Sequence, residues 1–241
     1  MPMTTIRPHA EAPIDPTAYR AVRRGLADLV ARLRDRADAT VPATPGWTVR
    51  EVIAHVVEIS GKVASRTGGE PGVRGATPAR ASAEIADLLT TWDRVGATVD
   101  RMLPELPPLR ARILMMDSLT HELDVRHAIG ADLAAPQEHP AFTNAFELLV
   151  QGFSRGLTER ALPALRLETE SEYWIAGEGR PAATVRADRF DLYRSLAGRR
   201  TREQIASLSW SAEPRRWLPA FEWGPFHLPP HPTERPTGGL S

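Results

Sequence analysis

The sequence has no cysteine among its 241 residues. This absence excludes disulfides, thiolate zinc sites and a cysteine nucleophile, so any thiol chemistry would need a thiol from outside the chain. Lysine is nearly absent as well, because Lys62 is the only one and the remaining positive charge is on arginine. Together with many Ala and Pro residues, this composition is typical of GC-rich genomes, such as those of actinobacteria.

Net charge is also lacking, since 30 basic residues balance 30 acidic ones. A neutral chain argues against binding to nucleic acid or to an anionic membrane, which usually needs a basic surface. The sequence contains no apolar run long enough to cross a bilayer, and its first residues contain no apolar core of a signal peptide. We therefore expect a cytoplasmic protein whose partners are small molecules.

The first two thirds of the chain repeat apolar residues at a helical period. Thr48 and Glu51 have the spacing of a capping box, and Trp47 and Val52 are placed for a hydrophobic staple. The segment from Thr67 to Arg80 is rich in Gly and Pro and is expected to be a mobile connection. We expect five helices, in chain order: one that starts at Pro16, one that starts near Trp47, and three that span 85–102, 109–129 and 141–161. Gly130 ends the fourth.

Beyond Pro163 the apolar period becomes alternating, which predicts short strands over 165–169, 173–176 and 183–187. Two more helices are expected, over 188–197 and from Thr201 to about 208. The fold class is therefore α+β, with a helical bundle followed by a small α+β domain. The expected segments are a flexible N-terminus (1–15), the bundle (16–162), the α+β domain (163–228) and a Pro-rich tail (229–241).

Three potential metal ligands lie on the expected fourth helix: Asp117, His121 and Asp124. Residues four apart differ by about 40° around a helix and those seven apart by about 20°, so these side chains project to one side. His55, among apolar residues of the second helix, is the best candidate for a ligand from elsewhere. Two histidines and a carboxylate leave a position open, as in catalytic zinc sites, and also suit nickel or ferrous iron. The ordinary alternative is a solvated surface pair of Asp and His.

Two motifs resemble those of the mycothiol-dependent maleylpyruvate isomerase family of the DinB superfamily. They are Trp47-Thr-Val-Arg-Glu-Val-Ile-Ala-His55 and Asp117-Ser-Leu-Thr-His121-Glu-Leu-Asp124. The resemblance covers most of residues 16–220. It implies a DinB-like four-helix bundle that binds a divalent metal, most often zinc, through His55, Asp117 and His121. Asp124 is then expected to lie behind the ligands and to orient an imidazole.

One position departs from that family's pattern, because Asp117 stands where the family has glutamate. The side chain is one methylene shorter, so we expect it to reach the metal through a helix shift or a bridging water, with a loss of affinity. Glu51 stands four residues before His55, but its capping role explains it. His127 should project away from His121, and the histidines in loops are expected to be solvated: His9, His139, His227 and His231.

The resemblance implies a metal-dependent enzyme that uses mycothiol or a similar low-molecular-weight thiol as co-substrate. The expected reaction is a cis–trans isomerisation by addition and elimination of the thiolate. A further stretch, Leu196-Ala-Gly-Arg-Arg200, is similar to one in the family, and Arg199 is the preferred catalytic residue, binding a substrate carboxylate or enolate. Its alternative role is a favourable charge at a helix C-terminus. A thiol S-transferase and a non-catalytic DinB-like binding protein stay open, as do a monomer and a homodimer.

Overall fold

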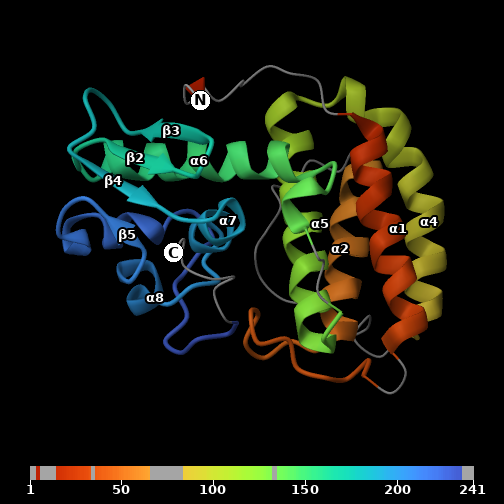
Figure 1. Ribbon diagram of the computed structural model, residues 1–241. Helices are drawn as coiled ribbons and strands as arrows, with labels where there is room; N and C mark the ends of the chain where they lie inside the picture. The colour runs from red at the N-terminus through yellow and green to blue at the C-terminus, as the bar shows by residue number, and fades with distance from the viewer. Residues whose placement is uncertain (1–3, 6–14, 34–35, 66–83, 132–134, 235–241) are drawn as a thin grey trace. The chain divides into compact units, whose positions relative to one another are not determined.

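The computed structural model describes residues 4–5, 15–33, 36–65, 84–131 and 135–234 (Figure 1). The chain forms two compact units. The bundle unit is Ala10–Ala145, and the sheet unit combines Met1–His9 with Phe146–Ser241. The division therefore falls inside a helix, whereas the sequence places it at residue 163. The expected connection 67–80 lies outside the described residues.

The described residues of the bundle unit include four long helices: α1 (Pro16–Leu33), α2 (Val49–Ala64), α4 (Ile85–Met102) and α5 (Pro108–Ile129). Each of α1 and α2 packs against both α4 and α5, so the helices form a closed ring in the order α1, α4, α2, α5 (Figure 1). The DinB-like four-helix bundle expected from the sequence is confirmed. The four helices also begin within one or two residues of their predicted positions.

Local chemistry explains where these helices begin and end. Asp15 accepts a hydrogen bond from the backbone N–H of Thr17 at 2.8 Å, which caps α1. Thr48 and Glu51 form the predicted capping box, with both reciprocal hydrogen bonds present. Gly130 ends α5 in the left-handed conformation with a φ of 67°, which glycine adopts without strain.

Helix α5 is buried on all sides from Ala111 to Val125, apart from a few positions of intermediate exposure. Polar side chains are part of this burial, among them His121, Glu122 and Asp124. Buried polar groups need partners, because leaving them unpaired costs free energy. The polar content of α5 therefore indicates either internal networks or a ligand site.

The sheet unit has one five-stranded sheet in the order β1-β3-β2-β4-β5. β2 pairs antiparallel with β3 and parallel with β4, while β5 pairs antiparallel with β4. Helix α6 packs on the sheet, since the ring centroids of Phe146 and Trp174 lie 4.8 Å apart in an edge-on contact. The elements are α6 (Phe142–Glu159), β2 (Leu165–Glu168), β3 (Glu172–Ala176), β4 (Ala183–Arg186), α7 (Arg189–Leu196), α8 (Arg202–Ala206) and β5 (Ser209–Trp210).

Two parts of the sheet unit differ from the expectation of loose ends. Thr4–Thr5 forms β1, which pairs parallel with β3, within the segment expected to be a flexible N-terminus. In the expected tail, Glu234 is buried and forms ion pairs with Arg194 and Arg200. Both differences arise from contacts between residues far apart in the sequence, which a local pattern does not reveal.

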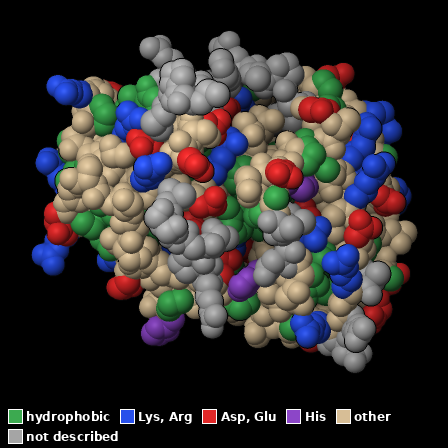
Figure 2. Space-filling model, in the orientation of Figure 1, with side chains coloured by type: hydrophobic (Ala, Val, Ile, Leu, Met, Phe, Trp, Pro, Cys, Tyr) green, Lys and Arg blue, Asp and Glu red, His purple; other side chains and the backbone are tan. Residues whose placement is uncertain are grey.

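On the face shown in Figure 2, basic and acidic side chains are interspersed, in agreement with the formal net charge of zero. No helix in the described part of the chain is long and apolar enough to cross a membrane.

Candidate metal centre

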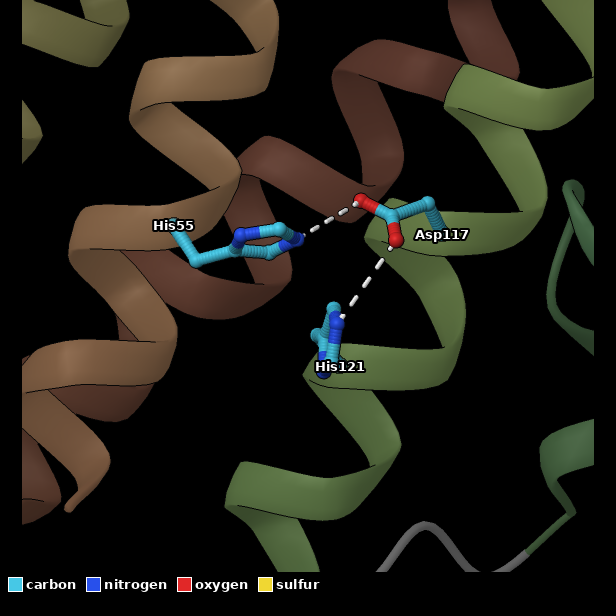
Figure 3. A group of neighbouring side chains, drawn as sticks. All are labelled: His55, Asp117 and His121. Carbon is cyan, nitrogen blue, oxygen red and sulfur yellow. Dashed lines mark ion pairs between the residues drawn. The ribbon is translucent and has the colours of Figure 1, made fainter. Parts of the chain in front are cut away.

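Two helices of the bundle bring His55, Asp117 and His121 together (Figure 3). His55 projects from α2, whose start is fixed by the Thr48 capping box, and the other two project from successive turns of α5. Because α2 and α5 are neighbours in the bundle, the side chain of His55 meets those of Asp117 and His121. The expected convergence of these three residues is present in the structure, and it lies wholly within the bundle unit.

The distances suit a shared ion better than direct hydrogen bonds. Asp117 Oδ2 lies 3.6 Å from His55 Nε2, and Asp117 Oδ1 lies 3.6 Å from His121 Nε2. These separations exceed those of a normal N–H···O hydrogen bond. Two ligand atoms bound to one tetrahedral zinc ion at 2.0–2.1 Å would lie about 3.4 Å apart. The residues present therefore fit a divalent metal.

The burial of the three side chains also favours a ligand site that is open on one side. His55 and His121 are 9% and 8% exposed, whereas the side chain of Asp117 is 23% exposed. The candidate ligand atoms of the three residues all lie within 4.8 Å of one another. Among the described residues, this is the group of potential metal ligands that lies so close together. The side chain of Asp117 is thus the most exposed of the three, although its Oδ2, which faces His55, is buried.

Asp124 stands behind His121 on the same helix. Its Oδ2 lies 3.4 Å from His121 Nδ1, and the side chain is fully buried. The other ring nitrogen, Nε2, is the one that faces Asp117. A carboxylate at Nδ1 holds an imidazole in the tautomer whose Nε2 is free to bind a metal. This placement agrees with the orienting role expected for Asp124.

Trp47 makes a ring contact with the two histidines that the sequence analysis did not predict. Its indole centroid lies 5.1 Å from the ring of His55 and 6.2 Å from that of His121, stacked on the latter at 23°. The residue immediately precedes the N-cap of α2 and is outside the helix. Helical spacing therefore cannot place it relative to His55. The sequence indicates its position for a hydrophobic staple and its place as the first residue of the motif that ends at His55, but no role at the centre.

A second polar cluster occupies the opposite side of α5. Arg126 donates two hydrogen bonds to Glu122 Oε1, at 2.9 and 2.7 Å, and His139 Nε2 lies 3.8 Å from Glu122 Oε2. Burial raises the pKa of Glu122 to about 7, although Arg126 lowers it in part. Burial, followed by the charge of Arg126, lowers the pKa of His139 to about 4. His139 was expected to be solvated, and this is wrong, because its side chain is only 11% exposed.

Several other candidates are placed away from the cluster. Glu51 is engaged in the capping box, as expected, and His127 is not in the cluster of described ligand residues. His227 and His231 are exposed, as expected, and His9 lies outside the described residues.

Arg199 and Arg200 belong to the sheet unit. Arg199 is buried and donates a hydrogen bond to the carbonyl of Ala197 at 2.6 Å, just past the end of α7. This contact agrees with its alternative role at a helix C-terminus. Arg200 is paired with Asp191 and Glu234 of the chain itself. The catalytic role of Arg199 stays a prediction.

Comparison with known proteins gives a family for the bundle and a fold for most of the chain. Residues 18–131 match the model of the DinB superfamily. The solved structure of the mycothiol-dependent maleylpyruvate isomerase is similar, with a TM-score of 0.54 and 16% identity, over 88% of this chain and 97% of that one. A histidine-to-alanine mutant of it gives a TM-score of 0.55 and 17% identity over the same shares. No curated protein sequence matches.

Proposed function

We propose that this protein is a metal-dependent enzyme that uses a low-molecular-weight thiol, and the match of residues 18–131 to the DinB superfamily model supports this. The observation that carries the proposal is the convergence of His55, Asp117 and His121 from two helices. The likeness of fold to the mycothiol-dependent maleylpyruvate isomerase supports mycothiol as the thiol. We propose cis–trans isomerisation of a small unsaturated acid as the reaction.

The ligand set would hold zinc through His55 Nε2, His121 Nε2 and a carboxylate oxygen of Asp117, which leaves a position for a further ligand. A bound zinc-like ion supplies Lewis acidity, which keeps a coordinated thiol ionised at neutral pH. The chain's own contribution is to orient its donors. The carboxylate of Asp124 lies 3.4 Å from His121 Nδ1, where it favours a proton on that nitrogen, and the surrounding apolar residues of α2 exclude water from the imidazoles.

The proposed chemistry follows from the reactivity of the thiolate. Its sulfur adds to the conjugated cis double bond, which becomes a single bond as its electron pair moves into the conjugated carbonyl to give an enolate, and rotation about that bond follows. Collapse of the enolate then re-forms the double bond in the trans geometry, breaks the new carbon–sulfur bond and releases the thiolate. If the adduct were retained instead, the protein would be a thiol S-transferase.

Arg199 is proposed to hold a substrate carboxylate on the strength of the sequence resemblance alone. Replacement by Lys keeps the charge but removes the bidentate geometry of the guanidinium. We expect R199K to raise KM for a carboxylate substrate without a loss of bound metal. A variant with unchanged KM would leave Arg199 with its helix-terminal role.

The first experiment measures metal content per chain after purification without chelators. We expect one zinc or nickel ion in the wild type and little in His55→Ala and His121→Ala, because each variant removes one of the three ligands. His127→Ala is the matched control, since it removes an imidazole from the same helix as His121 but outside the cluster. An empty wild type would favour the rival function, a non-catalytic DinB-like binding protein.

The second experiment distinguishes the two enzymatic outcomes. The holo protein is mixed with mycothiol and maleylpyruvate, and the absorbance of the substrate and the concentration of free thiol are followed together. A change in absorbance at constant thiol indicates isomerisation, whereas consumption of thiol indicates transfer. The cytoplasmic location, the actinobacterial source and the oligomeric state expected from the sequence stay predictions.

A further inference from the structure

The indole of Trp47 contacts both histidine ligands of the proposed metal centre. It lies 5.1 Å from the ring of His55 at an angle of 57°, and 6.2 Å from that of His121 at 23°. The two imidazoles are themselves 5.1 Å apart and nearly perpendicular, at 79°. Three aromatic rings from two helices and one loop therefore form a single cluster within the bundle unit.

The backbone on both sides of Trp47 is held in place by hydrogen bonds. The N–H of Trp47 donates to the carbonyl of Thr44 at 3.0 Å, and the carbonyl of Trp47 accepts from the N–H of Val41 at 2.9 Å. The next residue, Thr48, is the N-cap of α2 and forms its capping box with Glu51. The indole thus extends from an anchored turn, which fixes the point from which the side chain projects towards the two imidazoles.

Histidine rings need such external support to bind a metal in a defined geometry. The χ2 torsion of histidine is broad, so a packed backbone alone leaves the ring plane poorly fixed. Asp124 Oδ2 lies 3.4 Å from Nδ1 of His121, on one edge of that ring. The indole, by contrast, lies against both rings, and a stacked or tilted aromatic contact restricts rotation of each ring out of its plane.

We propose that Trp47 is a positioning residue for the metal centre, which fixes the ring planes of His55 and His121 so that their Nε2 atoms converge on Asp117. This inference rests on the proposed function, because it assumes that these three residues bind a metal. It adds a residue that acts through the ligands and does not bind the ion itself. Residues that orient metal ligands typically change metal affinity ten- to hundred-fold when replaced.

The test is a titration of the metal-free protein with Co²⁺, followed by visible absorption. We expect Trp47→Ala to weaken Co²⁺ binding about ten- to hundred-fold and to change the absorption spectrum, because the ligand rings are no longer fixed. Trp47→Phe keeps an aromatic plane and should restore most of the affinity and the spectrum of the wild type. Rescue by Phe separates ring support from a general loss of structure.

Trp92→Phe is the matched control. Trp92 is a buried indole of the same bundle unit, and it donates hydrogen bonds to Tyr19 and Ser60 at 3.1 and 2.9 Å, away from the ligands. Its replacement should lower stability and leave the Co²⁺ affinity of the folded protein unchanged. An equal loss of Co²⁺ affinity in Trp47→Ala and Trp92→Phe would mean that Trp47 acts only through the stability of the bundle.

Fluorescence gives an independent measurement of the same placement. Trp47 is one of six tryptophans, and we expect Co²⁺ to quench a component of the wild-type emission that is missing from Trp47→Phe. If Trp47→Ala binds Co²⁺ with the affinity and spectrum of the wild type, the inference is overturned while the metal centre stands. If the wild type binds no Co²⁺, the proposed function fails and the inference fails with it.

Discussion

At the scale of single residues, the carboxylate at position 117 sets the geometry of the candidate centre. Each of its oxygens lies 3.6 Å from one imidazole Nε2, so the short Asp side chain already spans the two histidines. The sequence analysis expected a helix shift or a bridging water to compensate for the missing methylene. In the structure α2 packs against α5, and both carboxylate oxygens of Asp117 lie at ligand spacing from the two rings; the helix shift and the bridging water stay predictions.

This geometry predicts the effect of restoring the glutamate of the related family. Asp117→Glu adds a methylene to a carboxylate that is already at ligand spacing, so its oxygens would pass beyond the position between the rings. We expect Co²⁺ binding to weaken about ten-fold or more, comparable to the loss of an orienting partner. Asp117→Asn, which removes the charge at constant length, should also weaken it. Tighter Co²⁺ binding by Asp117→Glu would show that the Asp117 side chain is too short for optimal metal binding.

His139 predicts a pH dependence of stability. Its pKa is lowered to about 4 from 6.5, first by burial and then by the charge of Arg126. Between these values the unfolded chain binds a proton that the folded protein does not, so stability falls as the pH falls from 6.5 towards 4. The neutral ring also accepts a hydrogen bond at Nδ1 from the backbone N–H of Ala141 at 3.1 Å.

His139→Asn keeps an acceptor and removes the titration. The wild type should lose about 2 kcal/mol more than the variant between pH 7 and pH 4.5. Urea unfolding of the metal-free proteins at the two pH values measures this difference. Because both proteins contain Glu122, which titrates nearby, the comparison between them is the informative quantity. Equal losses in both proteins would contradict the lowered pKa.

At the scale of elements, two glycines on different helices of the bundle have opposite roles. A Cβ added at Gly25 of α1 would lie 2.1 Å from Glu122 Oε1 and 3.0 Å from Arg126 Nη2. Glu122 is fully buried, so its carboxylate has no space into which to move. A Cβ at Gly61 of α2 would meet no atom within 4 Å. The close approach of α1 and α5 therefore depends on Gly25.

We expect Gly25→Ala to destabilise the bundle by about 1–3 kcal/mol, as an overpacked core substitution does. Gly61→Ala, the matched control, should stabilise it by up to about 1 kcal/mol, since alanine has the higher helix propensity and nothing obstructs it. Chemical unfolding followed by circular dichroism measures both changes. A neutral Gly25→Ala would indicate that Glu122 and Arg126 rearrange without cost.

The elements that the sequence predicted are those whose signals are local. Caps such as Asp15 and Thr48, the C-terminal Gly130 and the apolar period of each helix lie within a few residues of the element that they define. The short strands β1 and β5 have no such signal, because two residues cannot show a period and their pairing is with distant segments. The same reason explains why helical spacing grouped Asp117 with His121 but did not place Trp47, which lies outside a helix.

At the scale of the whole molecule, the sheet unit is assembled from both ends of the chain. Thr4–Thr5 pairs with β3, and Glu234 is held by buried arginines of α7 and the loop after it. The alternating pattern of the strands predicted that such a unit exists. It could not predict which remote residues complete it, because complementary charges leave no periodic trace in a sequence.

Glu234 gives the last prediction. Arg194 donates to it at 2.6 Å through Nε, and Arg200 is bound both to Glu234 and to Asp191. Arg194, Arg200 and Asp191 are almost fully buried, so loss of the Glu234 carboxylate leaves a positive charge without compensation in the interior. We expect Glu234→Gln to destabilise the sheet unit by about 3–5 kcal/mol.

Glu222→Gln is the matched control for this prediction. Glu222 accepts a hydrogen bond from Arg202 at 2.8 Å in a pair whose side chains are 39% and 46% exposed, and exposed pairs contribute at most about 1 kcal/mol. Chemical unfolding of both variants measures the difference. The Co²⁺ affinity of the folded protein should be unchanged in both, because the ligands belong to the bundle unit and Glu234 to the sheet unit. A loss of affinity in Glu234→Gln alone would show that the two units are energetically coupled.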